Sequence, residues 1–286
     1  MLGLFARAGA AAIPGASRLP FLPSGSGGDE LPDLTLVLED VTVDRERLAD
    51  YDRVCKFPLR DQLPATYPHI LAFPLQLSLM TDDSFPFPAL GLVHIENRIV
   101  AHRPIRIGEE LGIKVWATDL RDHPRGKQFT LRSEARVADQ LVWEEDSTIL
   151  RRGGSSGGGR SERKREGEEP QIPVTATWRL PGDLGRRYGS VSGDMNPIHI
   201  HPLSARAFGF PTAIVHGMWT KARCLAALLP RLPDRFTVEV EFKKPILLPA
   251  TVEFSEQEDS AGIRFAVRGA GKGTPHLDGR VSRSAV

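Results

Sequence analysis

Cysteine and net charge are both scarce in this chain. Its 286 residues include 2 cysteines, Cys55 and Cys224, whose spacing suits neither a metal site nor a redox pair and argues against a disulfide framework. The formal net charge of +1 gives no strong attraction to nucleic acid or to a membrane surface. No apolar run is long enough to cross a bilayer. We therefore expect a cytoplasmic protein with no nucleic-acid partner and no membrane span.

A clear secretory signal is also lacking. The apolar run Ala8–Ile13 is short, and no positive charge precedes the first apolar residues of the chain. The Arg-bearing, acid-free start has the composition of a transit peptide, but the simpler interpretation is an arm that packs on the body. Residues 24–33 are rich in Gly, Ser and Pro. We expect residues 1–33 to form a flexible N-terminal arm.

The clearest boundary lies at residues 151–173. Its first twenty residues contain no large apolar side chain, so this run cannot bury enough surface to offset the entropy of ordering. The basic cluster Arg163–Arg165 has the composition of a nucleic-acid contact, but glutamates surround it, which favours a solvated tether. We expect a disordered linker between two domains, at residues 34–150 and 174–286.

Both predicted domains alternate apolar and polar residues, as half-buried antiparallel strands do. A first strand is expected over Leu34–Val43. Further alternating apolar positions are Leu111, Ile113, Val115, Phe129 and Leu131 in the first half, and Val238, Val240, Phe242, Ile263, Phe265 and Val267 in the second. The two halves also repeat each other, because Arg103–Gly108 parallels Lys244–Pro249 and Tyr51–Cys55 parallels Tyr188–Ser192. Their sheets should join edge to edge, which would hide two strand edges at once.

The stretch Tyr188–Trp219 brings an acid, Asp194, and an imidazole, His199, close together along the chain. The residues around them are turn formers, so we expect a loop with fixed turns, where chemistry usually lies. A helix is predicted over Met218–Leu229 and ends at a proline. Gly217 would then lie at its first turn, where backbone N–H groups have no partner inside the helix.

This stretch resembles the motif of the MaoC-like family of (R)-specific enoyl-thioester hydratases and 3-hydroxyacyl-thioester dehydratases. The matching residues are Tyr188, Ser192, Gly193, Asp194, Asn196, Pro197, His199, Gly209, Phe210, His216, Gly217 and Met218. The resemblance implies an α+β hotdog fold, a long helix wrapped by an antiparallel sheet. Over the whole chain the similarity is to the two-hotdog bacterial members, which implies a double hotdog, a pseudo-dimer within one chain. A homodimer of such chains is left open.

The resemblance also implies the chemistry. Dehydration of a 3-hydroxyacyl thioester needs a base for the C2 proton, an acid for the leaving hydroxyl and a stabilised thioester oxygen. Asp194 and His199 would supply the proton transfers, and the Gly217 N–H the oxyanion site. No metal or organic cofactor is needed. The substrate would be a thioester of coenzyme A or acyl carrier protein, and the motif fixes neither the carrier nor the acyl length.

Four further residues of the motif would support the site: Tyr188, Ser192, Asn196 and His216. The resemblance gives Asn196 a role in shaping the loop, which a turn-forming Asn before Pro explains nearly as well. Ser192 would bond Asp194 or merely fit a tight turn. His216 would orient the oxyanion site, although a structural histidine is the simpler interpretation.

Carried along the chain, the repeat predicts that the first half is not catalytic. One register places Phe57 opposite Asp194 and Gln62 opposite His199, and a nearby register places Phe73-Pro74 opposite His216-Gly217. Proline has no backbone N–H, so the first half would lack acid, base and anion-binding amide together. Its helix is expected over Pro74–Met80. The leucine- and phenylalanine-rich first half would hold an acyl tail, although most such residues are simply core.

Other functions fit part of the pattern. His199 and His201 with Asp194 and His216 are residue types that bind zinc, although the full motif favours the hydratase. A hotdog thioesterase would use Asp194 to activate water against the thioester carbonyl. A non-catalytic acyl-binding subunit would fit the degenerate first half. Three basic residues, Lys243, Lys244 and Arg103, would meet phosphates or simply end strands in solvent.

Overall fold

The structure is a computed structural model that describes residues 28–89, 91–153 and 172–283. The predicted arm at residues 1–33 lies mostly outside the described residues, and so does most of the predicted linker at 151–173. No helix in the described ranges is long and apolar enough to cross a membrane.

The described part of the first half contains five strands and two helices. In chain order they are β1 (Thr35–Val41), α2 (Arg45–Cys55), α3 (Tyr67–Met80), β2 (Leu92–Ala101), β3 (Leu111–His123), β4 (Gly126–Val137) and β5 (Gln140–Arg152). Strand β5 pairs with β2 and β4 as far as Arg151 and Arg152, so the predicted linker begins too early by those residues. Strand β5 keeps its pairing with neighbouring strands past the last large apolar residue before the linker, and so the sheet extends into the first residues of the predicted linker.

The second half repeats this order and adds two short helices. Its elements are β6 (Val174–Leu180), α4 (Leu184–Ser192), α5 (Pro197–Ile200), α6 (Pro202–Ala207), α7 (Gly217–Leu228), the 3₁₀ turn η2 (Leu229–Arg231), β7 (Phe236–Phe242), β8 (Ala250–Asp259), β9 (Gly262–Gly269) and β10 (Pro275–Arg283). The helix predicted over Met218–Leu229 is confirmed as α7. The loop predicted from Tyr188 is wrong in part, because Tyr188 and Ser192 lie on α4 and His199 lies on α5.

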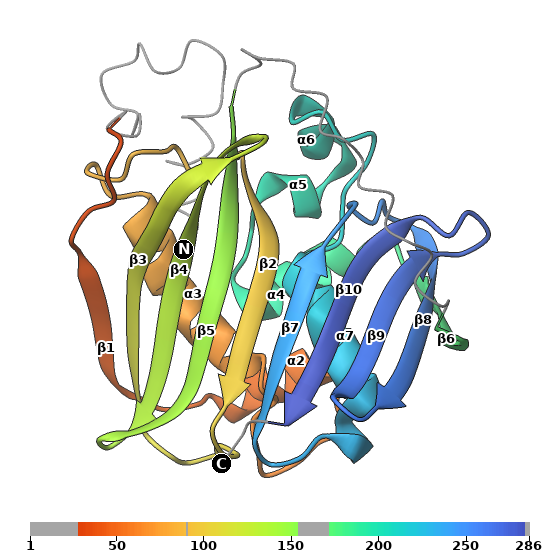
Figure 1. The fold of residues 1–286 in the computed structure, drawn as a ribbon, viewed down its shortest axis with the longest axis horizontal. Coiled ribbons are helices and arrows are strands. Elements are labelled where there is room, and N and C mark those ends of the chain that lie inside the picture. The colour runs from red at the N-terminus through yellow and green to blue at the C-terminus, as the bar shows by residue number, and fades with distance from the viewer. Residues whose placement is uncertain (1–27, 90, 154–171, 284–286) are drawn as a thin grey trace.

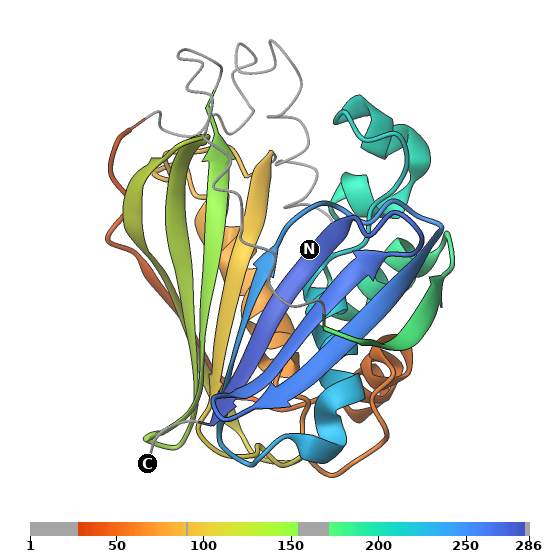
Figure 2. The same ribbon diagram turned by 45° about the vertical axis from the view of Figure 1, so that its right-hand side comes forward.

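All ten strands form one antiparallel sheet (Figures 1 and 2). Its order is β1-β3-β4-β5-β2-β7-β10-β9-β8-β6, which places the same five-strand arrangement on each side of the seam between β2 and β7. At the seam Asn97 lies opposite Val240 and Ile99 lies opposite Val238. The prediction that the two sheets join edge to edge is confirmed.

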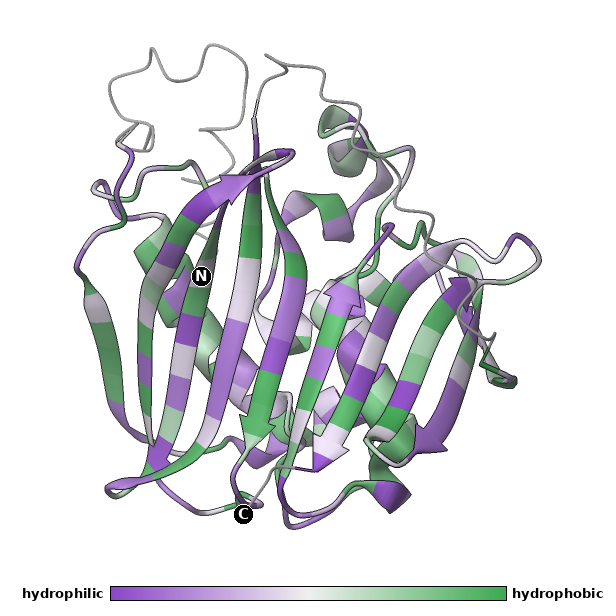
Figure 3. Ribbon diagram, viewed as in Figure 1, coloured by the Kyte–Doolittle hydropathy of each residue, from purple (hydrophilic) through white to green (hydrophobic). Residues whose placement is uncertain are grey.

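The helices cover one face of this sheet (Figure 1), with α3 behind the first half and α7 behind the second. The strands alternate between hydrophobic and hydrophilic residues (Figure 3), and the helices bury the apolar set. The buried apolar residues of both halves form one continuous core. A hydrogen bond also joins the halves, since Trp219 of α7 donates its indole N–H to the Val54 carbonyl of α2, 3.1 Å away. Each half is a helix wrapped by an antiparallel sheet, so the expected double hotdog is confirmed.

The first-half helix α3 begins earlier than predicted. It starts at Tyr67 with Pro68 in its first turn, whereas Pro74 lies inside it. The first-turn preference of proline was therefore assigned to the wrong residue. An interior proline usually costs a helix about 3 kcal/mol or more, and here the largely buried environment of α3 holds the helix together around it.

The register between the halves also needs correction. In the first half the Leu63 N–H donates to the Ile105 carbonyl at 2.8 Å. The equivalent bond in the second half runs from the Val215 N–H to the Ile246 carbonyl at 3.0 Å. Gln62 forms an isolated β-bridge with Arg106, and Ile214 forms the equivalent β-bridge with Leu247. Gln62 therefore corresponds to Ile214 and not to His199. By the same register Pro64, and not Phe73, corresponds to His216.

The first part of the predicted register agrees with the structure. Helices α2 and α4 both end in a left-handed residue, Lys56 with φ 69° and Gly193 with φ 83°. The residues that follow these caps are Phe57 and Asp194. The acid of the second half therefore has a phenylalanine as its counterpart in the first.

Candidate active site

A cavity of about 540 Å³ opens between the two halves. One end is lined by the predicted residues Tyr188, Ser192, Asp194, Asn196, His199, His216 and Gly217, which the structure therefore brings together. The other end is lined by α3, β2, β4 and β5 of the first half. The polar end thus comes from one half and much of the remaining wall from the other.

Asp194 is positioned by turns directly after α4. Its backbone N–H donates to the Ser192 hydroxyl oxygen at 3.1 Å, and its carboxylate Oδ1 accepts the Asn196 N–H at 3.1 Å. Asn196 in turn caps α5, because its Oδ1 accepts the Ile198 N–H at 3.3 Å. The end of α4 is held from the first half by Arg47, whose guanidinium donates to the Val191 and Ser192 carbonyls. These contacts fix the carboxylate at the cavity wall.

His199 is held with one ring nitrogen directed away from the protein backbone. Its Nδ1 donates to the Ile214 carbonyl at 2.8 Å, which leaves Nε2 for the cavity. Helix α5 can lie this close to α4 because Gly185 has no side chain: a Cβ there would meet the His199 carbonyl oxygen at 1.9 Å. Burial lowers the pKa of His199 below its ordinary value, although Asp194 opposes the shift. A neutral imidazole with a free Nε2 is competent to accept a proton.

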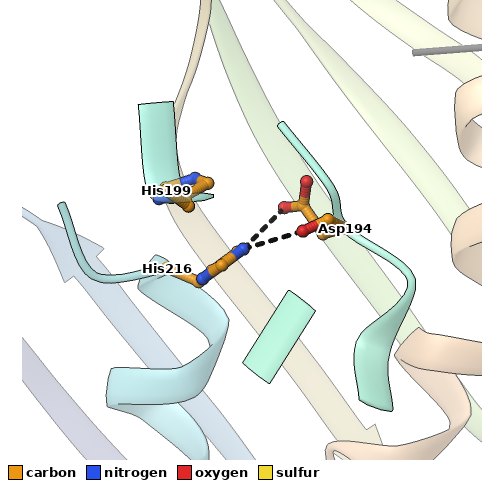
Figure 4. A group of neighbouring side chains, drawn as sticks. All are labelled: Asp194, His199 and His216. Atoms are coloured by element: carbon orange, nitrogen blue, oxygen red, sulfur yellow. Dashed lines mark hydrogen bonds and ion pairs between the residues drawn. The ribbon is translucent and has the colours of Figure 1, made fainter. Parts of the chain in front are cut away.

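His216 contacts both the acid and the base (Figure 4). Its ring stacks on that of His199 with centroids 3.7 Å apart, and its Nε2 donates to the Asp194 backbone carbonyl at 3.0 Å. The same nitrogen is 3.8 Å from the Asp194 carboxylate. Burial lowers the pKa of His216 to about 3, and His199 adds to this shift. His216 is therefore a neutral platform that positions the pair, closer to the structural interpretation than to a third proton carrier.

Gly217 begins α7 at the cavity. No side chain caps this helix, and the Gly217 N–H has no acceptor among the described residues. A Cβ at Gly217 would lie 3.0 Å from the Phe242 ring, a tight contact that the ring would have to yield to, so glycine allows the close approach. An uncapped helix start carries partial positive charge, which suits an oxygen that becomes negative. Tyr188 lines the wall beside it, with its ring 4.9 Å from that of His216.

The three side chains also have the composition of a metal site. One ligand atom of each of Asp194, His199 and His216 lies within 4.8 Å of the others. The Nε2 of His216 already donates a proton to a carbonyl, however, so only its buried Nδ1 keeps a lone pair for a metal. His201, the other histidine of the zinc interpretation, accepts the Leu203 N–H and caps α6 instead. The geometry suits proton transfer better than metal binding.

Some cavity residues have no counterpart in the motif. His69 and Gln76 of α3, His94 of β2 and Ser147 of β5 are polar residues that line the first-half wall. The sequence offered one signal for these residues, namely a polar side chain within a half that was expected to supply an apolar wall. Lys243 and Lys244 lie at the same cavity, as expected for phosphate contacts. Arg103 does not, because it lines a second cavity of about 500 Å³ and is paired with Glu109.

The fold and the site define a double hotdog protein with an acid–base pair beside one of its two long helices. A family model described as MaoC like domain matches residues 161–274. The chain is 37% identical over 266 residues to 3-hydroxyacyl-thioester dehydratase X of Mycobacterium tuberculosis, which covers 93% of this chain and 94% of that relative. The chain belongs to the MaoC-like family.

Two solved structures support this assignment. The crystal structure of HtdX of Mycobacterium tuberculosis matches with a TM-score of 0.78 and 37% identity, over 88% of this chain and 100% of that one. A MaoC-like dehydratase from Phytophthora capsici matches with a TM-score of 0.72 over 89% of this chain and 96% of that one. Because its identity is 21%, the second likeness bears on the fold alone.

Proposed function

We propose that this chain is a hydro-lyase that reversibly dehydrates (R)-3-hydroxyacyl thioesters to trans-2-enoyl thioesters, in the fatty-acid metabolism of the cytoplasm. One observation carries the proposal: the Asp194 carboxylate, the free Nε2 of His199 and the uncapped Gly217 N–H line one end of a single cavity. The related 3-hydroxyacyl-thioester dehydratase of Mycobacterium tuberculosis supports the same reaction class.

The reaction needs two proton transfers and one stabilised charge. In the dehydration direction the C2–H bond breaks, a proton goes to the protein, and the C3 hydroxyl leaves as water once it has been protonated. Asp194 and His199 carry these protons, and each positioned acid–base group is typically worth roughly 100- to 10,000-fold in rate. In the hydration direction, water held between the two groups attacks C3 as C2 takes up the proton.

The charge that develops on the thioester oxygen lies at the start of α7. The Gly217 N–H donates to this oxygen, and loss of one such donor typically costs about 3–4 kcal/mol. Because the amide is fixed by its helix, no reorganisation is needed as the charge forms. The reaction thus uses one carboxylate, one imidazole and one backbone amide, with no cofactor.

The carrier end of the thioester is coenzyme A or acyl carrier protein. Arg125, Lys244 and His276 lie at the same cavity, and Lys244 is exposed. Lys243 also lines this cavity, but its ammonium forms ion pairs with Glu241 and Asp278. Phosphates are bound by such basic side chains, so we place the pantetheine-bearing carrier at this rim. The pseudo-dimer then works as one catalytic half and one binding half.

The acyl tail runs along α3 of the first half. Phe73, Leu77 and Met80 line the cavity there, whereas Leu75 does not, and Phe57 lines the second cavity. The first half therefore contributes a wall for the tail, and Leu77 and Met80 of this wall belong to the helix expected over Pro74–Met80.

Replacing Met80 by Trp should shorten the acyl chains that the enzyme accepts. The larger ring would fill cavity volume that now takes methylene groups, each worth about 0.8 kcal/mol when buried. Loss of two such groups corresponds to roughly 10-fold in kcat/KM for long chains. Turnover of enoyl thioesters of graded length is the measurement, and Leu75→Trp on the same helix is the control. Equal activity of Met80→Trp on all lengths would place the tail elsewhere.

Purified protein incubated with enoyl-CoA esters of graded length tests the function itself. Loss of enoyl absorbance without release of free thiol is the expected result. Release of thiol would instead identify a thioesterase that uses Asp194 to activate water. Neither change, in a folded protein that still binds acyl thioesters, would identify a non-catalytic acyl-binding subunit.

Dialysis against a chelator should leave turnover of a short enoyl thioester unchanged. The reason is that proton transfer and one amide donor suffice for this chemistry. The measurement is activity before and after chelation, with metal content determined in the same samples. A stoichiometric metal whose removal abolishes turnover would make Asp194, His199 and His216 its ligands and overturn this mechanism.

A further inference from the structure

A second polar cluster faces the cavity from the first half, and the proposed reaction does not use it. His69, Gln76, His94 and Ser147 contribute to the cavity wall. Behind them lies Glu145, which is 1% exposed. Polar groups are costly beside an acyl tail unless they are hydrogen-bonded, so this cluster needs an explanation beyond packing.

Glu145 is ionised and fully engaged. Its Oε2 accepts from His69 Nδ1 at 2.9 Å and from Gln76 Nε2 at 3.1 Å, and its Oε1 accepts from Asn97 Nδ2 at 2.8 Å. Burial acts to raise the pKa of Glu145, but His69, Asn97 and Lys221 outweigh it and hold that pKa below its ordinary value. The carboxylate therefore fixes the orientation of the His69 ring.

The fixed ring leaves one nitrogen for a ligand. Since His69 Nδ1 donates to Glu145, its Nε2 is the nitrogen left over, and it has no hydrogen-bond partner within the described residues. His94, on the neighbouring part of the same wall, has a buried Nε2 that also lacks a partner there. A saturated chain would leave His69 Nε2 unpaired, which is unfavourable for a polar group that loses its contact with water.

We propose that the cavity is built for acyl thioesters that carry a hydroxyl group further along the acyl chain than C3, and that His69, backed by Glu145 and adjoined by His94, hydrogen-bonds this second hydroxyl. A hydroxyl suits His69 in either protonation state, because it donates to a neutral Nε2 and accepts from a protonated one. The inference rests on the proposed dehydratase function and adds the class of acyl group to it.

A purely structural role does not account for these contacts. Lys221, Asn97 and Glu145 already join α7 to the β2–β7 seam, and that connection uses neither His69 Nε2 nor His94 Nε2. His69, which keeps a free Nε2, lines the cavity, so a ligand there can pair with it, whereas His94 Nε2 is closed off from solvent. A site that hydrogen-bonds a hydroxyl discriminates strongly against the analogue that lacks it.

The test compares enoyl-CoA esters of one chain length, either unsubstituted or with a single hydroxyl moved along the acyl chain. At one position the hydroxylated ester should exceed the plain ester in kcat/KM by at least about 10-fold, a modest value for such a site. His69→Phe should reduce this ratio to about one, and His69→Gln should retain part of it. His123→Phe, which changes a histidine outside the cavity, should leave the ratio unchanged.

Failure of the inference and failure of the proposed function give different results. Turnover of plain esters with no preference for a hydroxyl at any position would overturn the inference and leave the dehydratase standing. If no enoyl ester turns over, calorimetric binding of saturated acyl-CoA esters with and without the hydroxyl still decides the question. Equal affinities would overturn the inference, and a hydroxyl preference that His69→Gln weakens would support it.

Discussion

Asp194→Asn and His199→Gln should each lower turnover of a short enoyl thioester by at least about 100-fold, the lower range for a lost acid–base group. The first change keeps the size of the side chain but removes the carboxylate, and the second keeps an amide but removes the titrating ring. Binding of a non-reactive acyl thioester should persist, because both groups act mainly in the transition state. Steady-state kinetics and calorimetric binding are the two measurements, with a thermal melt to verify folding.

The pH profile of the wild-type enzyme gives a second readout of the same pair. The pKa of His199 lies below its ordinary value of 6.5, so the ring stays neutral until the pH falls below that value. The acid-side decline of kcat/KM should therefore lie below about pH 6.5, and His199→Gln should remove the contribution of this group.

Gln62→Ala, in the second cavity, is the matched control for the two variants Asp194→Asn and His199→Gln. Loss of activity in Gln62→Ala, with Asp194→Asn and His199→Gln still active, would place the chemistry in the first half.

Lys221→Met should lower the free energy of unfolding by about 3–5 kcal/mol, as removal of one partner from a buried ionic network typically does. Lys221 is 0% exposed, and its ammonium donates to the Asn97 carbonyl, the Asn97 side-chain oxygen and the Val238 carbonyl. Methionine keeps the volume but removes these three hydrogen bonds and leaves Glu145 without its nearby ammonium.

Urea unfolding followed by circular dichroism measures this loss. Lys244→Met makes the same change at an exposed position and should alter stability by less than about 0.5 kcal/mol, as is usual for surface substitutions. An equally small loss in Lys221→Met would mean that the buried ammonium contributes no net stability, and that the charge of Glu145 is balanced by other groups.

The sequence predicted the fold and the residues that line the candidate site because both depend on local signals. The strands have a period of two, α7 is apolar and ends before a proline, and the acid, the base and the helix start follow one another in the motif. Long-range contacts were not predictable in this way. Arg47, which holds the end of α4, lies in the first half and carries no sign of its partner in the sequence.

The register of the first half was predictable only up to its first helix. Helices α2 and α4 match without gaps, and Phe57 falls opposite Asp194 as predicted. Beyond that point the second half inserts α5 and α6, for which the first half has no counterpart. Counting onward without gaps therefore misplaced Gln62, and the nearby register misplaced Pro74, since an insertion leaves no local mark in the half that lacks it.

The buried polar cluster was missed for a different reason. Glu145 lies on a strand and Lys221 on a helix, at positions where a charged residue ordinarily indicates a solvated face. In this fold α7 lies against the seam and is covered by both halves, so Lys221 points into protein instead of water. Burial of this kind depends on tertiary packing, which no period in the sequence reports.

The seam between β2 and β7 has a genetic consequence. In an assembly of two identical chains, every substitution appears in both copies, so a residue cannot become a catalyst in one and a tail-binding wall in the other. Here one continuous chain supplies both sides of the seam, and each side can vary alone. Placing an aspartate at Phe57 would not create a second reaction centre, because the segment that carries His199 exists on one side only.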